Sequence, residues 1–130
     1  MTTTTLNTSL NTSLSATAPG SAPATVRIAH AGGWVAVCGT DVLSAGRGAA
    51  VLLPDGEQAA LFMDRSGTVY AIGNRDPFTG AYVLARGLLG SAAGRPFVAS
   101  PLLKQRFDLA TGACLDDDEV SVPVYAVRVE

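Results

Sequence analysis

The chain has 130 residues, 48% of them hydrophobic, and a formal net charge of -2 at pH 7. This charge gives no general attraction to nucleic acid or to an anionic membrane, so we expect neither as a partner. No stretch reaches the roughly 20 apolar residues that a membrane-spanning helix needs, and we therefore expect a soluble protein.

The first 24 residues are rich in Thr, Ser, Ala and Asn and contain no charged residue. They lack the basic start and continuous apolar run of a secretory signal, and the Arg residues of a mitochondrial transit peptide. Leu6, Leu10 and Leu14 recur every four residues, but the Thr, Asn and Ser around them are poor helix formers. We predict a disordered tail over residues 1–24, one folded domain over residues 25–130 and a cytoplasmic location.

The folded part is predicted to be all-β. From Gly33 onward, short stretches rich in Val, Leu, Tyr and Phe alternate with Gly, Pro and Asp. Strands are expected in WVAVCG, in three segments of GAAVLLPDGEQAALFMDRSGTVYAIGN, and in GRPFVAS, KQRFDLATGACL and VPVYAVRV. Turns are expected at residues 54–56, 66–67 and 110–112, where Gly supplies the positive φ of a tight turn. No window longer than eight residues has a convincing helical period.

Few residues suit catalysis or metal binding. His30 is the sole histidine and adjoins the predicted tail, so it is expected to be a solvated surface residue rather than a catalytic base. Cys38 and Cys114 lie in different predicted strands and are expected to be separate buried thiols. The acidic run Asp116–Glu119 has neither calcium-loop nor enzyme-dyad spacing and predicts a solvated turn. The four glycines within residues 80–94 match no nucleotide-binding loop and predict a flexible hairpin.

Two loops carry the most informative pattern, AIGNRDPFTG and VASPLLKQRFDLATG. The order of meander, first loop, Gly-containing hairpin, second loop and RFDLATG strand with its turn resembles the Rieske [2Fe-2S] domain over almost the whole folded part. Rieske loops carry Cys-x-His and Cys-x-x-His, because one iron takes two thiolates and the other takes two imidazoles. The matching positions in this chain are Asp76, Phe78, Ser100 and Leu103.

These four residues cannot replace the cluster ligands. Carboxylate and hydroxyl oxygens are unsuited to a sulfide cluster, and Phe and Leu carry no donor atom. We therefore expect no metal and no cofactor on this chain, and no catalytic residue. Phe78 and Leu103 are expected to fill the space that a cluster would occupy and to pack the two loops together.

A closer resemblance rests on the stretches Gly46–Phe62, GNRDPF, SPLLKQRFDLATG and CLDD. From about Trp34 to Val129 the chain is similar to the small subunit of NADH-dependent assimilatory nitrite reductase. The resemblance implies a cofactor-free subunit of a heteromeric complex. Its large subunit would carry FAD, a [4Fe-4S] cluster and siroheme and reduce nitrite to ammonium. Two alternatives stay open: a Rieske-ferredoxin-type electron-transfer protein, and a β-domain adaptor of another oxidoreductase.

Charge is unevenly distributed along the chain. Residues 74–107 contain five basic residues against Asp76 alone, a local net charge of +4. Basic and apolar residues together are typical of a docking surface with an apolar centre and a charged rim. The predicted partner-binding residues are Arg75, Phe78, Leu102, Leu103, Lys104 and Arg106. In the alternative interpretation, Arg75 and Asp76 pair locally and the apolar residues are interior.

Overall fold

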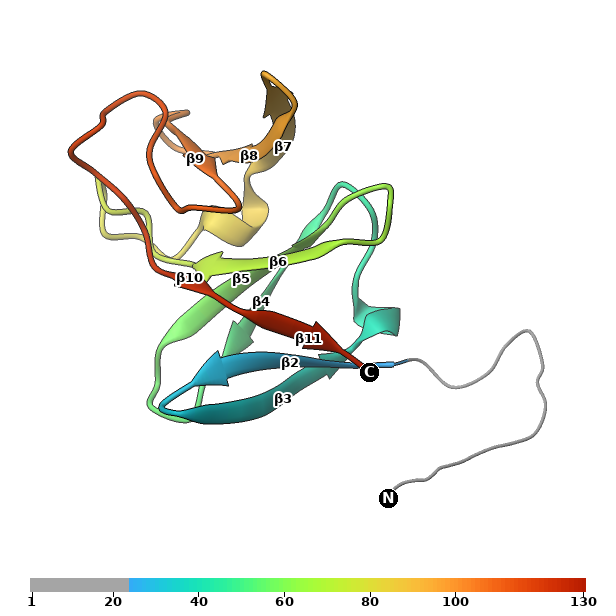
Figure 1. Cartoon of the computed structure of the whole chain (residues 1–130). Helices are drawn as coiled ribbons and strands as arrows, with labels where there is room; N and C mark the ends of the chain where they lie inside the picture. The colour runs from blue at the N-terminus through green and yellow to red at the C-terminus, as the bar shows by residue number, and fades with distance from the viewer. Residues whose placement is uncertain (1–23) are drawn as a thin grey trace, which may run out of the picture.

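The computed structural model describes residues 24–130, so the predicted tail lies outside the described residues except for Ala24. The described part is all-β, as predicted, with three antiparallel sheets and two short 3-10 helices (Figure 1). Seven strands form the larger module: β2 (Thr25–His30), β3 (Gly33–Gly39), β4 (Gly48–Leu52), β5 (Gln58–Met63), β6 (Val69–Gly73), β10 (Val124–Tyr125) and β11 (Val127–Val129). The smaller module contains β7 (Leu88–Ala92), β8 (Arg95–Ala99) and β9 (Arg106–Asp108).

The larger module consists of two sheets with the strand orders β10-β6-β5-β4 and β11-β2-β3. The consecutive strands β10 and β11 carry the chain from one sheet to the other. The smaller module is the sheet β7-β8-β9, connected to β6 through the 3-10 helix η3 (Leu84–Arg86). The other 3-10 helix, η2 (Thr40–Val42), follows β3. Neither helix of the described part is long or apolar enough to cross a membrane.

The hydrophobic core has two clusters, and strand β5 contributes to both. Ala60 and Phe62 belong to the cluster shared with the smaller module, whereas Ala59 and Leu61 belong to the cluster inside the larger module. Successive side chains of a strand point to opposite faces, so β5 is buried on both faces. This explains why its sequence is a continuous apolar run without alternation.

Strand β2 was not predicted from the sequence. It pairs with β3 and β11 and buries Val26 and Ile28 completely. The prediction that His30 is a solvated surface residue is wrong, because His30 ends this strand and its side chain is only 17% exposed. Its Nε2 atom lies 3.0 Å from a carboxylate oxygen of Asp55, and its ring lies near Tyr125.

The two cysteines are separate thiols, as predicted, but only one of them is buried. Both are free; Cys114 is buried and Cys38 is half-buried. Burial, with a smaller contribution from the nearby Asp41 carboxylate, raises the pKa of the Cys38 thiol. A raised pKa lowers the thiolate fraction and makes a reactive role less favourable.

Candidate functional site

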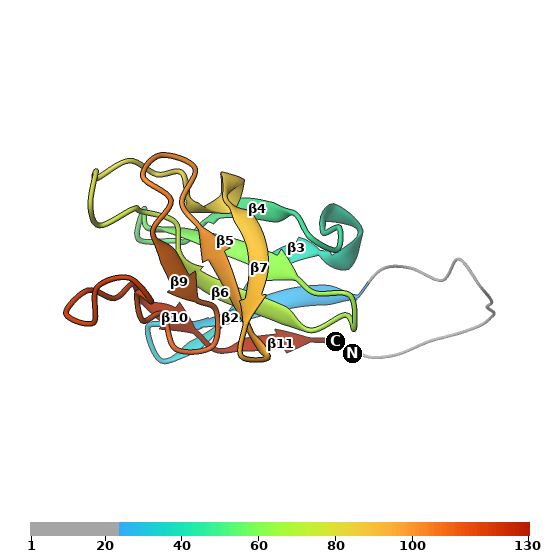
Figure 2. The same cartoon turned by 90° about the horizontal axis from the view of Figure 1, so that it is seen from above.

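The two loops of the Rieske-like pattern lie side by side at one end of the smaller module (Figure 2). The first loop (residues 74–83) follows β6, and the second loop (residues 100–105) follows β8. Asp76 and Ser100 are buried, with 0% and 1% of their surface exposed. Ser100 Oγ donates a hydrogen bond to Asp76 Oδ2 over 2.6 Å. A direct hydrogen bond thus joins the loops at two of the four positions that carry ligands in a Rieske site.

Residues 76–81 and 100–105 share one hydrogen-bonding pattern. In each segment the first N–H donates to the sixth carbonyl and the fifth N–H donates to the first carbonyl. The third N–H donates to the side-chain oxygen of the first residue, over 2.8 Å at Asp76 and 3.3 Å at Ser100. A short side chain with an acceptor oxygen is therefore required at the first position. Asp76 and Ser100 meet this requirement.

The pattern occurs a third time, in residues 108–113 after β9. The fifth residue has a positive φ in all three segments: Gly80 at 81°, Lys104 at 67° and Gly112 at 77°. Two of the segments read DPFTGA and DLATGA, so the repeat D-x-x-T-G-A is visible in the sequence. This repeat is a signal from which the shared loop form could have been predicted.

Asn74 anchors the start of the first loop through two side-chain hydrogen bonds. No role was predicted for this residue from the sequence. It is 2% exposed. Its Nδ2 atom donates to Gln58 Oε1 over 2.9 Å, and its Oδ1 atom accepts the N–H of Ala85 over 2.8 Å. Asn74 thereby connects the loop to β5 and η3. A single Asn after an apolar strand is a weak signal, because its partners lie 16 and 11 residues away.

The apolar side chains of the two loops face outward. Phe78 is 36% exposed, Leu102 is 50% exposed and Leu103 is 55% exposed. The ring of Phe78 touches the buried Phe107, with 6.3 Å between ring centroids. The alternative that these residues are interior is therefore wrong for Leu102 and Leu103, whereas Phe78 is partly buried against Phe107. That Phe78 and Leu103 fill the space of a cluster stays a prediction. The buried contact between the loops is the polar pair Asp76–Ser100.

Two of the five basic residues within residues 74–107 form ion pairs with carboxylates of the chain. Arg106 forms a two-point contact with Asp116, through Nε at 3.2 Å and Nη2 at 2.9 Å, and lies over the ring of Phe97. The hydrogen bonds from Arg106 lower the pKa of the Asp116 carboxyl group. Arg95 Nε lies 2.7 Å from Asp108 Oδ2. Arg106 and Arg95 therefore add less unpaired positive charge to residues 74–107 than the sequence count indicates.

Arg75, Lys104 and Arg86 make no ion pair within residues 24–130. Arg75 Nε donates to the carbonyl of Gly80 over 3.3 Å, and no pair with Asp76 forms. Arg75 and Lys104 are exposed beside the apolar loop side chains. The acidic run Asp116–Glu119 is exposed, as predicted.

The residues of the two loops do not fit a [2Fe-2S] cluster. Asp76 and Ser100 are bonded to each other and to the loop backbone, and Phe78 and Leu103 have no donor atom. Two thiolates and two imidazoles would be required. Elsewhere in residues 24–130, no three His, Cys, Asp or Glu side chains come together in a way that could hold a metal ion.

Comparison with known proteins agrees with this geometry. Residues 33–130 match the family of the Rieske-like [2Fe-2S] domain, so fold and loops define a Rieske-like domain in which the four ligand positions carry other residues. Over 98 residues the chain is 45% identical to the nitrite reductase (NADH) small subunit of Salmonella typhimurium strain LT2, covering 75% of this chain and 90% of that protein. The chain belongs to the family of nitrite reductase (NADH) small subunits.

Three further relatives are informative. A Mycobacterium tuberculosis structure, described as an NADH-dependent nitrite reductase small subunit, is 50% identical with a TM-score of 0.69, covering 81% of this chain and 86% of that one. The ferredoxin of carbazole 1,9a-dioxygenase from Nocardioides aromaticivorans IC177 is 31% identical with a TM-score of 0.62, covering 74% and 88%. A nitrite reductase [NAD(P)H] large subunit of Klebsiella oxytoca is 44% identical over 98 residues, 75% of this chain but 10% of that protein.

Proposed function

We propose that this chain is the cofactor-free, non-catalytic small subunit of an NADH-dependent assimilatory nitrite reductase and that it binds the large subunit in the cytoplasm. The main support for the proposal is the similarity of this chain to two kinds of nitrite reductase subunit. One is a separate small subunit, 90% of which is covered by the matched segment, and in the other the related segment is part of a large subunit. A domain that occurs both fused and separate is expected to contact the same partner in both arrangements. The large subunit would carry FAD, a [4Fe-4S] cluster and siroheme.

The surface proposed for this contact is the loop face, defined by Arg75, Phe78, Leu102, Leu103, Lys104 and Arg106. Its support is chemical. Exposed apolar side chains lie beside basic groups, which suits a partner surface with a nonpolar centre and acidic residues around it. Arg75 and Lys104 keep their charges unpaired within the described residues, whereas Arg106 already has a carboxylate partner. Arg75 and Lys104 are therefore the stronger candidates for the charged rim.

Binding of purified variants to the large subunit tests this proposal. Phe78→Asp and Leu103→Asp are expected to weaken binding about tenfold or more, because each places a charge at the apolar centre. Lys104→Glu is expected chiefly to slow association and to make it less sensitive to salt. Leu52→Asp is the matched control, since Leu52 is 70% exposed on β4 and outside the loop face. Thermal melts verify that each variant is folded. If folded Asp variants bind normally, another surface, such as Asp116–Glu119, makes the contact.

The absence of a cofactor is a separate part of the proposal. The purified chain is expected to be colourless and to contain no stoichiometric iron, because the loop residues cannot supply the Rieske ligand set. Iron analysis and a visible spectrum after anaerobic reconstitution measure this. Bound iron with acid-labile sulfide and the visible bands of a Rieske cluster would instead support the electron-transfer alternative, whose fold the carbazole dioxygenase ferredoxin shares.

A further inference from the structure

The outer edge of β7 has no strand beside it in the described part of the chain. In the sheet β7-β8-β9, residues 113–115 cover the outer side of β9. The carbonyl of Ala113 accepts the N–H of Asp108, and the N–H of Leu115 donates to the carbonyl of Arg106. The sequence of β7, LLGSA, has no charge and no proline, and its pairing with β8 has no bulge. Charges, prolines and bulges are the usual devices that protect an edge strand from pairing with another chain. Within residues 24–130, none of these devices protects the edge of β7.

The backbone groups that face outward can be identified from the hairpin geometry. The turn Ala93–Gly94 has positive φ at both residues, so the flanking pair Ala92/Arg95 is hydrogen-bonded. Hydrogen-bonded and non-hydrogen-bonded pairs alternate along an antiparallel ladder. Leu89/Val98 and Ser91/Pro96 are therefore the non-hydrogen-bonded pairs, which agrees with the missing N–H of Pro96. The N–H and C=O groups of Leu89 and Ser91 point away from β8 to the open edge.

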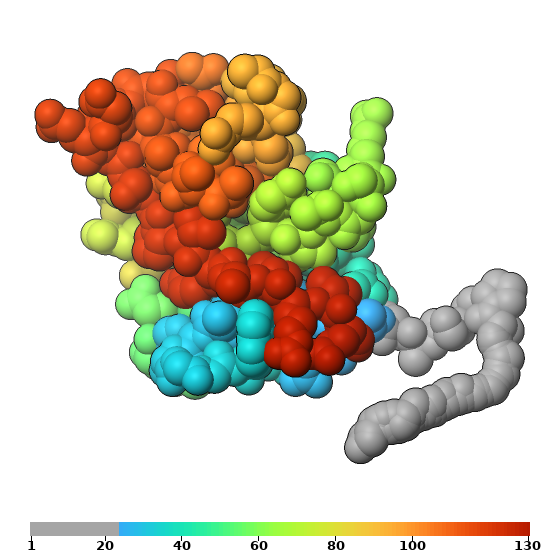
Figure 3. Space-filling view, viewed as in Figure 1, coloured from blue at the N-terminus to red at the C-terminus, as the bar shows by residue number. Residues whose placement is uncertain are grey.

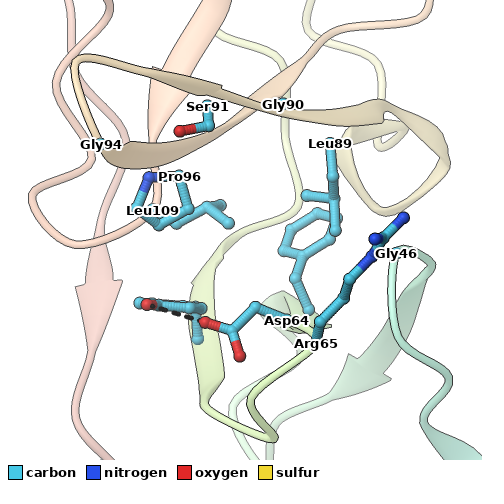
Figure 4. Close-up of a pocket in the computed structure, with 11 residues that line it drawn as sticks. Gly46, Asp64, Arg65, Leu89, Gly90, Ser91, Gly94, Pro96 and Leu109 are labelled. Atoms are coloured by element: carbon cyan, nitrogen blue, oxygen red, sulfur yellow. Dashed lines mark hydrogen bonds between the residues drawn. The ribbon is translucent and has the colours of Figure 1, made fainter.

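A groove borders this edge. One cavity of about 490 Å³ lies between the β7–β8 hairpin and the turn that carries Asp64 and Arg65 (Figure 4). A second cavity of about 500 Å³ adjoins it at Gly46 and continues past the start of β7 at Leu88. Figure 3 shows the hollow between the orange surface of the hairpin and the yellow-green surface of the β5–β6 turn. The groove shares no residue with the loop face.

The groove carries positive charge and an exposed apolar side chain. Arg65 lines the first cavity, Arg47 and Arg86 line the second, and none of these three arginines makes an ion pair within residues 24–130. The carboxylate in the groove, Asp64, accepts hydrogen bonds from its own turn. Leu88 is 75% exposed at the entrance. Acidic side chains on an entering segment would be complementary to this lining.

We infer that the free edge of β7 is a binding site for an extended, acidic segment of a partner protein, which adds a strand to the sheet β7-β8-β9. Backbone hydrogen bonds to Leu89 and Ser91 hold the segment, and Arg47, Arg65 and Arg86 select carboxylates on it. The inference goes beyond the proposed docking at the loop face, because it concerns a different surface and a different mode of recognition.

Amide hydrogen exchange of the full chain, followed by NMR, tests the inference with a defined probe. The probe is a capped octapeptide of alternating Glu and Val at a concentration on the order of 1 mM, suited to weak binding. Exchange at the Leu89 and Ser91 amides is expected to slow about twofold when half of the chain is bound and about tenfold when nine-tenths is bound, because only the free fraction exchanges. An octapeptide of alternating Lys and Val is the charge control and is expected to leave both amides unchanged. The same measurement is repeated with the nitrite reductase large subunit as the probe.

Ser91→Pro is the decisive variant. Proline removes the outward N–H without removing a bond to β8, as is tolerated on edge strands, and Ser91→Ala keeps that N–H. Ser91→Pro is expected to weaken peptide binding about tenfold and Ser91→Ala less than about twofold. The inference is overturned if neither probe slows the two amides, if the Lys peptide protects them equally, or if folded Ser91→Pro binds normally. A large subunit that binds without protecting Leu89 and Ser91 would overturn the inference and leave the proposed function intact.

Discussion

At the scale of single residues, the two loops keep a buried contact whose chemistry differs from a metal site. In a Rieske domain the loops are joined through the ligated cluster. Here the Ser100 hydroxyl donates to the Asp76 carboxylate, and both side chains also cap backbone N–H groups of their own loops. A buried oxygen that is hydrogen-bonded stabilises the fold, whereas one without a partner is costly.

Ser100→Ala tests the strength of this contact. The substitution leaves a buried carboxylate oxygen without its donor and is expected to lower the free energy of unfolding by about 1 to 3 kcal/mol. Ser121→Ala is the control, since Ser121 is exposed and should change stability by less than about 0.5 kcal/mol. Urea unfolding of both variants gives the comparison. Equal stabilities would mean that the Asp76–Ser100 hydrogen bond contributes nothing measurable.

Asp108 is a buried carboxylate whose hydrogen-bond partners link its charge to acid stability. Burial by itself would raise the pKa of Asp108, but hydrogen bonds from Arg95 and from the N–H groups of Ala110 and Thr111 hold it below its ordinary value. A carboxyl group whose pKa is lower in the folded chain stabilises the fold above its unfolded pKa of about 3.9. That stabilisation is lost as the pH falls through the folded pKa.

Asp108→Asn is accordingly expected to reduce stability near neutral pH by about 1.5 to 3 kcal/mol, because a buried charge-assisted hydrogen bond is lost. The gap between the wild-type chain and the variant should narrow below a pH of about 4, where the carboxylate becomes protonated. Unfolding curves across this pH range measure the gap. Asp116→Asn, at the more exposed pair with Arg106, serves for comparison and should cost no more than about 1 kcal/mol. A gap that stays constant down to pH 2 would contradict the assignment to Asp108.

At the scale of elements, one loop form recurs after β6, β8 and β9. Its backbone hydrogen bonds are the same each time. The residue with positive φ is Gly in two of the loops and Lys104 in the second. The left-handed conformation costs a non-glycine residue about 1 to 2 kcal/mol, while glycine adds about 0.5 to 1 kcal/mol of unfolded-state entropy. Lys104 therefore retains a strain that Gly80 and Gly112 avoid.

Exchanging the residue type at this position should change stability with opposite signs. Gly80→Ala is expected to destabilise the fold and Lys104→Gly to stabilise it, each by about 0.5 to 1 kcal/mol. An added Cβ at Gly80 meets only the flexible Arg75 side chain, so the backbone conformation dominates the effect. Denaturant midpoints of the two variants measure both signs. A destabilised Lys104→Gly variant would show that the lysine side chain stabilises the loop by more than its backbone strain.

The glycines near the β7–β8 hairpin were predicted to make it flexible, but two of them are needed for close packing. A Cβ at Gly87 would collide with the carbonyl of Ala99, and one at Gly90 would collide with the ring of Phe97. Both glycines therefore allow close packing within the hairpin. The physical reason is the approach of a neighbouring strand, which the sequence of the glycine segment alone does not contain.

At the scale of the whole molecule, both core clusters are formed by residues after Ala24. The carbonyl of Ala24 accepts the N–H of Thr40 over 2.9 Å, which marks the start of the contacts that the structure describes. We expect removal of residues 1–23 to change Tm by less than about 4 °C, corresponding to about 1 kcal/mol for a domain of this size. Melts of full-length and truncated chains decide this. A larger drop would show that the segment packs on the domain.

Three properties were predictable from the sequence: the all-β class, the Rieske-like order of loops and the loss of the ligand set. These properties depend on residue type and spacing along the chain. A thiolate ligand requires Cys and an imidazole ligand requires His. The residues at the four ligand positions, Asp76, Phe78, Ser100 and Leu103, therefore exclude the Rieske ligand set. The family followed from the same stretches and was confirmed by the relatives.

The three-dimensional fold was needed to show which of these residues face solvent and which have partners. Ser100 meets Asp76 across 24 residues, and Arg106 meets Asp116 across ten. The unprotected edge of β7 likewise exists only because no later segment of the described chain pairs with it. Exposure and pairing depend on what the fold places opposite a side chain, and strand pairing brings those groups from distant positions. Residue type alone therefore could not decide between a surface and an interior position for Phe78, and could not assign a partner to His30.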